Sequence, residues 1–284
     1  MPELPELEAL GGFLRSCLVG RRISAVTVAS VAALKTYDPP VESLVGRTIG
    51  SVVRHGKFLD FVVDDVHLVV HLARGGWIRW EPDGVRRSVR GGPLVMRLAV
   101  GDAAVLDITE AGTHKQTACY VVTDPRTIPG IARLGIDPLD PALNPERFAA
   151  LVQGTRCRLK TWLRDQTILA GIGNAYSDEI LHAAKLSPFH PTSSLTPPEI
   201  NRLYLATRAV LAEAVDHASR LGPDGLKSDK ETRAKVHGRA GMPCPVCGDT
   251  IRSVYFADSS LQYCPTCQTD GRPLADRRLS RLLK

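Results

Sequence analysis

The sequence predicts an α+β fold, in which a first helix and an antiparallel β-sandwich or barrel precede a helical region and a short cysteine-rich end. Three observations predict it. Apolar residues recur at helical spacing near the N-terminus, many short stretches then alternate with a period of two, and helical spacing returns after a proline-rich segment. A run of strands followed by a run of helices is typical of α+β proteins.

Length and composition set the class of protein. The 284 residues are enough for about two domains at roughly 100–200 residues each. With 44% hydrophobic and 23% charged residues, the chain is neither disordered nor fibrous. Its 7 cysteines, an odd number, argue against a secreted disulfide framework. The sequence shows no signal peptide and no apolar run of roughly 20 residues, so we expect a cytoplasmic protein with no membrane partner.

The N-terminal domain is expected over residues 1–124. A first helix is predicted at 4–18, because Leu7, Leu10 and Leu14 share one face and Pro5 suits the first turn. Gly and Asp residues then separate short alternating stretches that predict strands. These strands are expected at 23–28, 47–54, 57–64, 67–73, 76–81, 93–100 and 117–123.

A linker is expected at 125–145, which contains five prolines, and a helical domain at 146–240. Three short helices are predicted at 146–153, 159–166 and 175–185. A fourth is predicted from Thr196, because Thr196 and Glu199 have capping-box spacing and two prolines suit the first turn. Residues 218–240 are polar and basic without a clear period, so we expect a flexible loop there.

Positive charge is concentrated near the C-terminal end. The chain carries a formal net charge of +6, and residues 220–284 hold 12 Lys and Arg against 7 Asp and Glu. Such a distribution indicates either a module that faces a polyanion or a solvated basic tail.

Two CxxC pairs give the strongest functional signal. Cys244 and Cys247 are followed, after sixteen residues, by Cys264 and Cys267. Four thiolates at this spacing are typical of a zinc ribbon, in which one Zn²⁺ holds together a segment too short to bury a core. The alternative, a pair of redox motifs, is disfavoured because redox CxxC motifs usually occur singly at a helix start. We therefore predict one structural Zn²⁺ in a zinc finger with a basic tail, over 241–284.

The N-terminus carries a second signal. Removal of Met1 would expose Pro2 as a secondary amine, and an α-amino group has a pKa of about 7.7–8.0 against about 10.4 for lysine. A neutral amine can attack a sugar C1′ and form an iminium, with Glu3 and Glu6 as proton carriers. Taken alone, the same residues also describe an acidic, capped helix start.

Two further motifs are weaker. In the GIGNAYSDE stretch at 171–179, two glycines permit a tight turn and Asn174 can cap the following helix, so its backbone N–H groups suit a phosphate. The alternative is an ordinary connection between helices. Lys57 follows a His-Gly pair at a predicted strand turn, with His71 one strand away, and either residue could equally be an unremarkable surface or strand residue.

Together these motifs resemble one family. The PELPELE start, HGK with Lys57, HL with His71, the stretch LRDQTILAGIGNAYSDEIL at 163–181 and the final CPVC and YCPTCQ are similar to formamidopyrimidine-DNA glycosylase and endonuclease VIII. They occur in the family's order from Pro2 to Gln268. The resemblance implies an N-terminal helix with a two-layered antiparallel β-sandwich, then a helix–two-turn–helix domain and a zinc finger. It also implies that DNA lies in a cleft between the two halves with the damaged nucleotide flipped out.

The resemblance also implies an activity. The protein would be a bifunctional DNA glycosylase and AP lyase of base excision repair. Its substrate would be double-stranded DNA with an abasic site or a damaged base, which is an oxidised base by family default. It would act as a monomer in the cytoplasm of a bacterium, near the nucleoid. Pro2 would be the nucleophile and Schiff-base former, Glu3 would protonate the deoxyribose ring oxygen, and Glu6 would support the proton network. Lys57 would also assist strand cleavage by elimination. The implied DNA-binding residues are Lys57, His71, Arg74, Lys160, Asn174 and Arg252.

Several residues depart from the family pattern, and all fall on DNA or lesion recognition. Ser259 stands where the zinc-finger hairpin carries a phosphate-clamping arginine, for which Arg252, Arg272 or Arg277 could compensate. Arg74 replaces a methionine, and 109–115 replaces the stretch with the other wedge residues. A backbone-contacting histidine falls near Gly91, and the loop over the flipped base is shortened around 222–235. A catalytically inactive damaged-DNA-binding protein is therefore the alternative, ahead of a zinc-ribbon factor for RNA or protein.

Overall fold

The chain folds into two compact units. The computed structural model describes residues 1–84, 93–223, 225–226, 233–256 and 259–275. The first unit comprises Met1–Leu134 and Val215–Lys227, and the second Gly135–Ala214 and Ser228–Lys284. Over the described part of the chain, no helix combines the length and the apolar character needed to cross a membrane.

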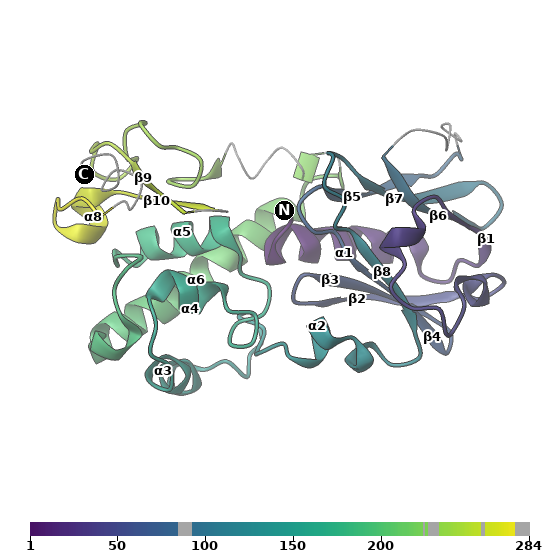
Figure 1. The fold of residues 1–284 in the computed structure, drawn as a ribbon, viewed down its shortest axis with the longest axis horizontal. Helices are drawn as coiled ribbons and strands as arrows, with labels where there is room; N and C mark the ends of the chain where they lie inside the picture. Colours follow the sequence, from purple (N-terminus) through teal and green to yellow (C-terminus); the bar gives the residue numbers. More distant parts are fainter. Residues whose placement is uncertain (85–92, 224, 227–232, 257–258, 276–284) are drawn as a thin grey trace. The chain divides into compact units, whose positions relative to one another are not determined.

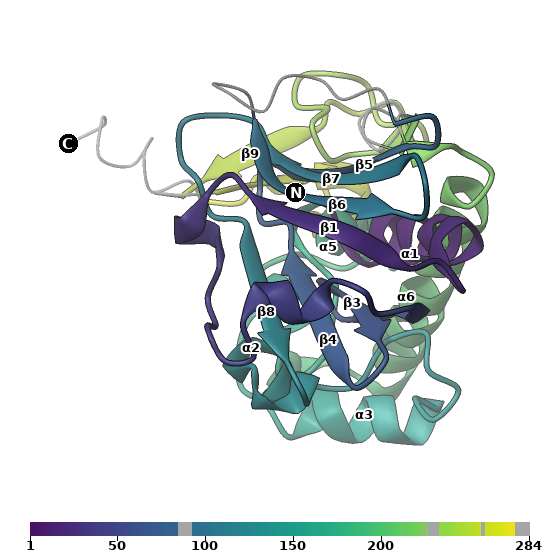
Figure 2. The same ribbon diagram turned by 90° about the vertical axis from the view of Figure 1, so that its right-hand side faces the viewer.

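The first unit is the predicted two-layered antiparallel β-sandwich. Its two four-stranded sheets have the orders β1-β6-β7-β5 and β2-β3-β4-β8, and Figure 2 looks onto both layers. The strands are β1 (Ile23–Val28), β2 (Ile49–His55), β3 (Phe58–Val63), β4 (Val66–His71), β5 (Gly76–Glu81), β6 (Leu94–Val100), β7 (Ala104–Glu110) and β8 (Ala118–Val122).

One strand, β7, is absent from the strands that alternation predicts. All seven of its residues are buried, including the polar Asp107 and Thr109, which alternate with the apolar Leu106 and Ile108. It lies between β5 and β6 in the sheet. Its one aspartate, Asp107, is held by the guanidinium of Arg97 on β6, which donates to both carboxylate oxygens at 2.6 Å.

The first helix, α1 (Leu4–Leu18), packs its apolar face into the core of the sandwich. Leu7, Leu10 and Leu14 are almost completely buried there. On the side of the helix that faces β2, the guanidinium of Arg15 donates to the backbone oxygen of Val52. Burial of each leucine stabilises the unit by roughly 1.5–3 kcal/mol, so α1 is an integral part of the sandwich and its first residues are positioned by that packing.

The proline-rich segment is more than a linker. A turn at 125–127 leads into the short helix α2 (Pro129–Ala132), which begins with a proline in its first turn. Ile128 and Ile131 cluster with Val69 and Val122, and so cover part of the sheet face that points away from the main core. Apolar burial therefore gives this segment a structure that its proline content alone did not predict.

The second unit contains the predicted helices and the cysteine-rich hairpin (Figure 1). Trp162 and Phe148 form its aromatic core, with ring centroids 5.2 Å apart, and Tyr204 packs on Phe148 from the other side. Its elements are α3 (Pro145–Gln153), α4 (Leu159–Arg164), α5 (Asn174–Ala183), α6 (Pro197–Ala218), β9 (Arg252–Tyr255), β10 (Ser260–Tyr263) and α8 (Pro265–Thr269). The last turn of α6 is counted with the first unit.

The described ends of the predicted flexible loop at 218–240 are well packed. Leu226 is buried against the core of the first unit, and Val236 against the cysteine cluster of the second. The carboxylate of Glu179 accepts hydrogen bonds from the backbone N–H groups of 235, 236 and 237 at 2.8–3.0 Å. Composition alone indicated a loop because only a few apolar residues, among them Leu226 and Val236, stand in a mostly polar sequence. Residues 224 and 227–232 lie outside the described part of the chain.

Candidate functional site

The N-terminus of α1 brings two carboxylates next to Pro2. Glu3 is the N-cap, and its backbone N–H donates to Glu6 Oε2 at 2.7 Å, while its own side chain accepts from the backbone of Glu6. Both residues are buried, at 3% and 5% exposure. This reciprocal capping box ties both side chains to the backbone of the first turn. Glu6 thus positions Glu3, as a supporting residue of a proton network would.

Pro2 is itself buried in the chain that retains Met1, and Met1 is 47% exposed. The pyrrolidine nitrogen is then part of a peptide bond and is not a nucleophile. Removal of the exposed Met1 is the step that would turn this nitrogen into a secondary amine. The position of Pro2 therefore makes methionine removal a requirement for any covalent chemistry at this end of the chain.

Lys57 and His71 lie at the same end of one sheet. Lys57 occupies the turn between β2 and β3, where Gly56 has a φ of +55° that favours glycine. His71 ends β4 and pairs with Phe58, whose ring centroid lies 4.7 Å from that of the imidazole. Burial, and secondly the charge of Lys57, lower the pKa of His71 below its usual 6.5. The imidazole is therefore neutral at neutral pH and can donate one N–H bond to an anion.

This pKa gives a testable prediction. We expect the ring-proton NMR titration of His71 to have its midpoint below 6.5, and Lys57→Gln to move it part of the way back, because a positive charge is lost. Between the folded pKa and about 6.5 the unfolded chain binds the extra proton, so the stability linked to His71 is complete above pH 6.5 and declines as the pH falls below it. An unchanged midpoint in Lys57→Gln would contradict the charge effect.

Arg74 is the exposed residue of an otherwise largely buried turn between β4 and β5, beside the segment that departs from the family pattern. Glycine is required here: a Cβ on Gly76 would lie 2.2 Å from the backbone oxygen of Leu72. The same turn accepts a hydrogen bond from the backbone N–H of Ala111 to Gly75. Glu110 Oε1 then accepts from the backbone N–H of Gln116 and Thr117, so the neighbouring exposed segment at 111–116 is anchored at both ends.

In the second unit, Lys160 is the centre of a buried polar cluster. Its ammonium donates to Asp178 Oδ1 at 2.6 Å, to Ser177 Oγ at 2.9 Å and to the backbone oxygen of Asn174 at 2.9 Å. Asp178 is fully buried and also bonds His237 Nδ1 at 2.8 Å. The charge of Lys160 is thus neutralised inside the protein, and its hydrogen bonds connect α4 to α5. Contact of Lys160 with DNA stays a prediction.

Asn174 does not cap its helix, contrary to the sequence analysis. The N-cap of α5 is Gly173, and Asn174 is the first helical residue. Its Nδ2 donates instead to the backbone oxygen of Ser260 on β10 at 2.8 Å, and its buried Oδ1 has no hydrogen-bond partner in the described part of the chain. The tight G-x-G turn before it brings the helix start close to the hairpin, which is why the side chain reaches across.

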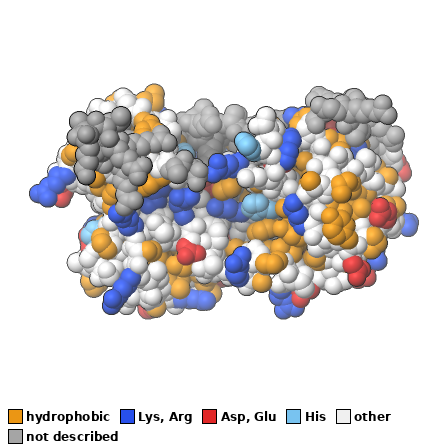
Figure 3. Space-filling view, in the orientation of Figure 1, with side chains coloured by type: hydrophobic (Ala, Val, Ile, Leu, Met, Phe, Trp, Pro, Cys, Tyr) orange, Lys and Arg blue, Asp and Glu red, His pale blue; other side chains and the backbone are white. Residues whose placement is uncertain are grey.

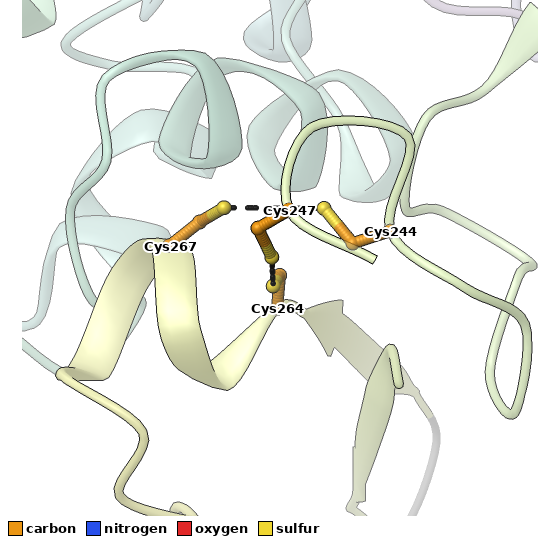
Figure 4. Close-up of side chains that lie close together, drawn as sticks. All are labelled: Cys244, Cys247, Cys264 and Cys267. Atoms are coloured by element: carbon orange, nitrogen blue, oxygen red, sulfur yellow. Dashed lines mark hydrogen bonds between the residues drawn. The ribbon is translucent and has the colours of Figure 1, made fainter. Parts of the chain in front are cut away.

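The four cysteines converge as predicted (Figure 4). Their Sγ atoms all lie within 4.8 Å of one another, with Cys247 and Cys264 at 3.3 Å and Cys244 and Cys267 at 3.9 Å. Tetrahedral Zn–S bonds of about 2.3 Å place sulfur atoms about 3.8 Å apart, so the set fits one Zn²⁺. Four protein thiolates leave no position for a substrate, and the zinc is structural.

Residues outside the motif complete the ribbon. His182 on α5 is buried and its Nε2 lies 3.3 Å from Cys244 Sγ, where an imidazole N–H would donate to the thiolate of a zinc ligand. Gln268 donates to the backbone oxygen of Leu186, and its own Oε1 accepts from the backbone N–H of Cys264. Sequence patterning did not identify His182, because it is distant in sequence from the cysteines and nothing marks a single helical histidine.

The other predicted contacts have simple placements. Arg252, the first residue of β9, is exposed, and so is Arg272 after α8. Arg277 and Gly91 lie outside the described residues. The structure therefore brings together the N-terminal carboxylates and, separately, the four cysteines, and it places Lys57 beside His71.

A β-sandwich headed by a buried carboxylate pair, a helical unit and a four-cysteine zinc ribbon define a zinc-containing DNA glycosylase of base excision repair, as comparison with known proteins confirms. Three family domains match in order: the formamidopyrimidine-DNA glycosylase N-terminal domain at residues 1–128, its H2TH domain at 134–222, and the zinc finger found in FPG and IleRS at 241–269. The chain belongs to the formamidopyrimidine-DNA glycosylase family.

Individual relatives agree with this assignment. The formamidopyrimidine-DNA glycosylase of Thermus thermophilus is 38% identical over 280 residues, which cover 95% of this chain and 100% of the relative. An uncharacterized formamidopyrimidine-DNA glycosylase-like protein of Mycobacterium tuberculosis is 52% identical over 151 residues, 53% of this chain and 94% of that protein. The crystal structure of the Thermus thermophilus MutM (FPG) protein superposes with a TM-score of 0.81 at 35% identity, covering 96% of this chain and 100% of that one. A Lactococcus lactis FPG variant in complex with a Fapy-dG containing DNA superposes at 0.83 with 25% identity, covering 94% and 100%.

Proposed function

We propose that the protein is a bifunctional DNA glycosylase and AP lyase, which removes a damaged, oxidised base through a Schiff base on Pro2 and then cuts the strand. After Met1 is removed, the Pro2 nitrogen attacks C1′ of the damaged nucleotide. The base leaves with the electrons of its bond to C1′ and takes up the proton that the Pro2 nitrogen loses. Glu3 donates its proton to the deoxyribose ring oxygen, which opens the ring and leaves an iminium between Pro2 and C1′. The buried Glu3–Glu6 capping box supports this proposal most directly, because it holds a proton donor within one residue of the nucleophile.

Strand cleavage follows from the iminium. The positive nitrogen acidifies the C2′ protons, and loss of one of them expels the 3′ phosphate by β-elimination. Lys57 is proposed to assist this step and, with the neutral His71, to bind a flanking phosphate of double-stranded DNA. The exposed Arg74 and Arg252 and the amide of Asn174 are proposed as further DNA contacts, since cationic and amide side chains bind phosphate without regard to sequence.

Borohydride trapping tests the proposal. The protein is incubated with an abasic-site duplex and borohydride, which reduces the iminium to a stable amine. We expect a covalent adduct that disappears in a protein with an N-terminal tag and that is reduced in Pro2→Gly, where a primary amine replaces the secondary one. The wild-type protein should carry Pro2 as its first residue when analysed by mass spectrometry. If the trapped adduct persists in the tagged protein, the nucleophile is a residue other than Pro2.

A catalytically inactive damaged-DNA-binding protein is the second candidate, and the departures from the family pattern at Arg74, 109–115 and Ser259 favour it. The same assay separates the two. Tight binding of the abasic duplex without an adduct at any pH from about 6 to 9, on both sides of the ordinary α-amino pKa, would establish the binder.

A further inference from the structure

A cavity of about 260 Å³ lies in the second unit, beside the β9–β10 hairpin and away from the four cysteines. Arg158, Lys160 and Arg164 line it from the side of α4. Phe189 and Phe256 contribute aromatic walls, and Ser259 closes it on the hairpin. Its volume is slightly below the ~300–1,000 Å³ of typical ligand pockets, enough for a phosphate group with part of a sugar or base.

The described lining of the cavity is positively charged. Arg158 and Arg164 are exposed, and no carboxylate within the described residues pairs with either guanidinium. Lys160 adds little, because its ammonium is neutralised by Asp178. None of the described lining residues is acidic. Two uncompensated guanidinium groups therefore face a common space, a combination that attracts an anion. Figure 3 shows Lys and Arg side chains gathered on the visible surface over α4 and α5.

Aromatic rings orient this charge. The guanidinium of Arg158 lies over the ring of Phe189, with 4.4 Å from its central carbon to the ring centroid. A stacked guanidinium keeps its N–H groups at the edge free to form bonds in its own plane. Phe256, the neighbour of β9, meets Phe189 edge-on at 6.4 Å and is itself 39% exposed. The cavity thus combines oriented N–H donors with an open apolar ring.

We propose that this cavity is a phosphodiester-binding subsite, in which Arg158 and Arg164 hold one backbone phosphate of bound DNA and Phe256 packs against the adjoining sugar or base. The inference rests on the proposed function and deepens it. It also assigns the compensation for Ser259 to two arginines of the helical region, rather than to Arg252, Arg272 or Arg277. The small side chain of Ser259 contributes a hydroxyl and leaves the space open, while α4 supplies the charge.

The first test measures the salt dependence of DNA binding. The probe is a duplex with a tetrahydrofuran abasic analogue, and the variant is Arg158→Ala/Arg164→Ala. We expect affinity to fall roughly ten- to hundredfold, as for lost hydrogen bonds to charged groups, and the slope of log K against log salt to fall by about 1, as for one phosphate. Arg147→Ala is the matched control, because Arg147 is an exposed arginine of α3 in the same unit and outside the cavity. It should keep the wild-type slope. Equal slopes for all three proteins would overturn the proposal.

The second test locates the phosphate. Methylphosphonates, which are uncharged, replace the phosphates of the duplex one at a time. One position should weaken binding of the wild-type protein but not of the double variant, since the two changes remove the same interaction. Absence of any such position would refute a phosphodiester subsite. Zinc content and the far-UV spectrum of the variant report whether it is folded.

These outcomes are distinct from failure of the proposed function. Borohydride trapping is measured on the wild-type protein, and it depends on Pro2 rather than on the cavity. If trapping is intact but no methylphosphonate position depends on Arg158 and Arg164, the subsite alone is rejected. If one methylphosphonate position depends on these arginines but no adduct is trapped, the subsite is retained and the covalent enzyme is rejected.

Discussion

Cys264→Ala should release the single zinc ion and unfold residues 241–269. The reason is the small size of the apolar cluster around the metal, whose buried members are Val236, Cys244, Ile251 and Cys264. Structural zinc contributes apparent binding free energies of about 10–16 kcal/mol in zinc-finger peptides. A whole domain has a net stability of only about 5–15 kcal/mol. A cluster of this size therefore cannot hold the ribbon together without the metal.

The measurement is a colorimetric zinc assay, followed by titration of an abasic-analogue duplex. We expect one zinc per wild-type chain, none in the variant, and loss of most DNA affinity, since Phe256, Ser259 and Leu261 of the hairpin line the proposed phosphate subsite. Cys157→Ala is the control, because Cys157 lies in the same unit but outside the cluster of four cysteines. The Cys157→Ala protein should retain one zinc. A Cys264→Ala protein with one bound zinc and unchanged affinity would contradict a structural role for the metal.

Glu3→Gln should slow base excision by about 10²–10⁴-fold while leaving the fold intact. General acid catalysis is typically worth this factor, and an amide has no proton of comparable acidity to give to the ring oxygen. A glutamine oxygen still accepts from the backbone of Glu6, so the capping box at the start of α1 survives. Single-turnover excision of a damaged base, with thermal unfolding measured in parallel, gives both quantities.

The matched control is Glu8→Gln. Glu8 is also on the first turns of α1, but its side chain is 36% exposed and pairs with Arg54 on β2. It should keep the wild-type excision rate. If Glu3→Gln excises at the wild-type rate, the proton reaches the sugar from another group, and the role proposed for Glu3 is wrong.

Local pattern predicted most of the secondary structure. α1 was predicted because its leucines repeat on one face, and α6 because Thr196, Pro197 and Glu199 mark its start. β7 was not predicted, although Leu106 and Ile108 alternate with Asp107 and Thr109, and the structure buries both of its faces. The turn and helix at 125–132 were missed because prolines there begin short helices, and the apolar residues that hold them, Ile128 and Ile131, find their partners on a distant sheet.

The candidate site divides in the same way. The cysteine ligands could be predicted, since each CxxC pair is local and the metal needs four thiolates. The partners of Asp178 could not, because Lys160, His237 and the hairpin approach it from three separate segments. The cavity of Arg158, Arg164 and Ser259 has the same origin.

By itself, then, the amino-acid sequence determined the order of the domains, the zinc ligands and the acidic, proline-started terminus, because each depends on residues close together along the chain. The tertiary structure alone decided that Asn174 bonds the hairpin rather than capping its helix, that Lys160 is neutralised in the interior, and that two arginines line an open cavity at Ser259. These properties depend on which surfaces pack together, and packing depends on the whole apolar pattern rather than on any one motif.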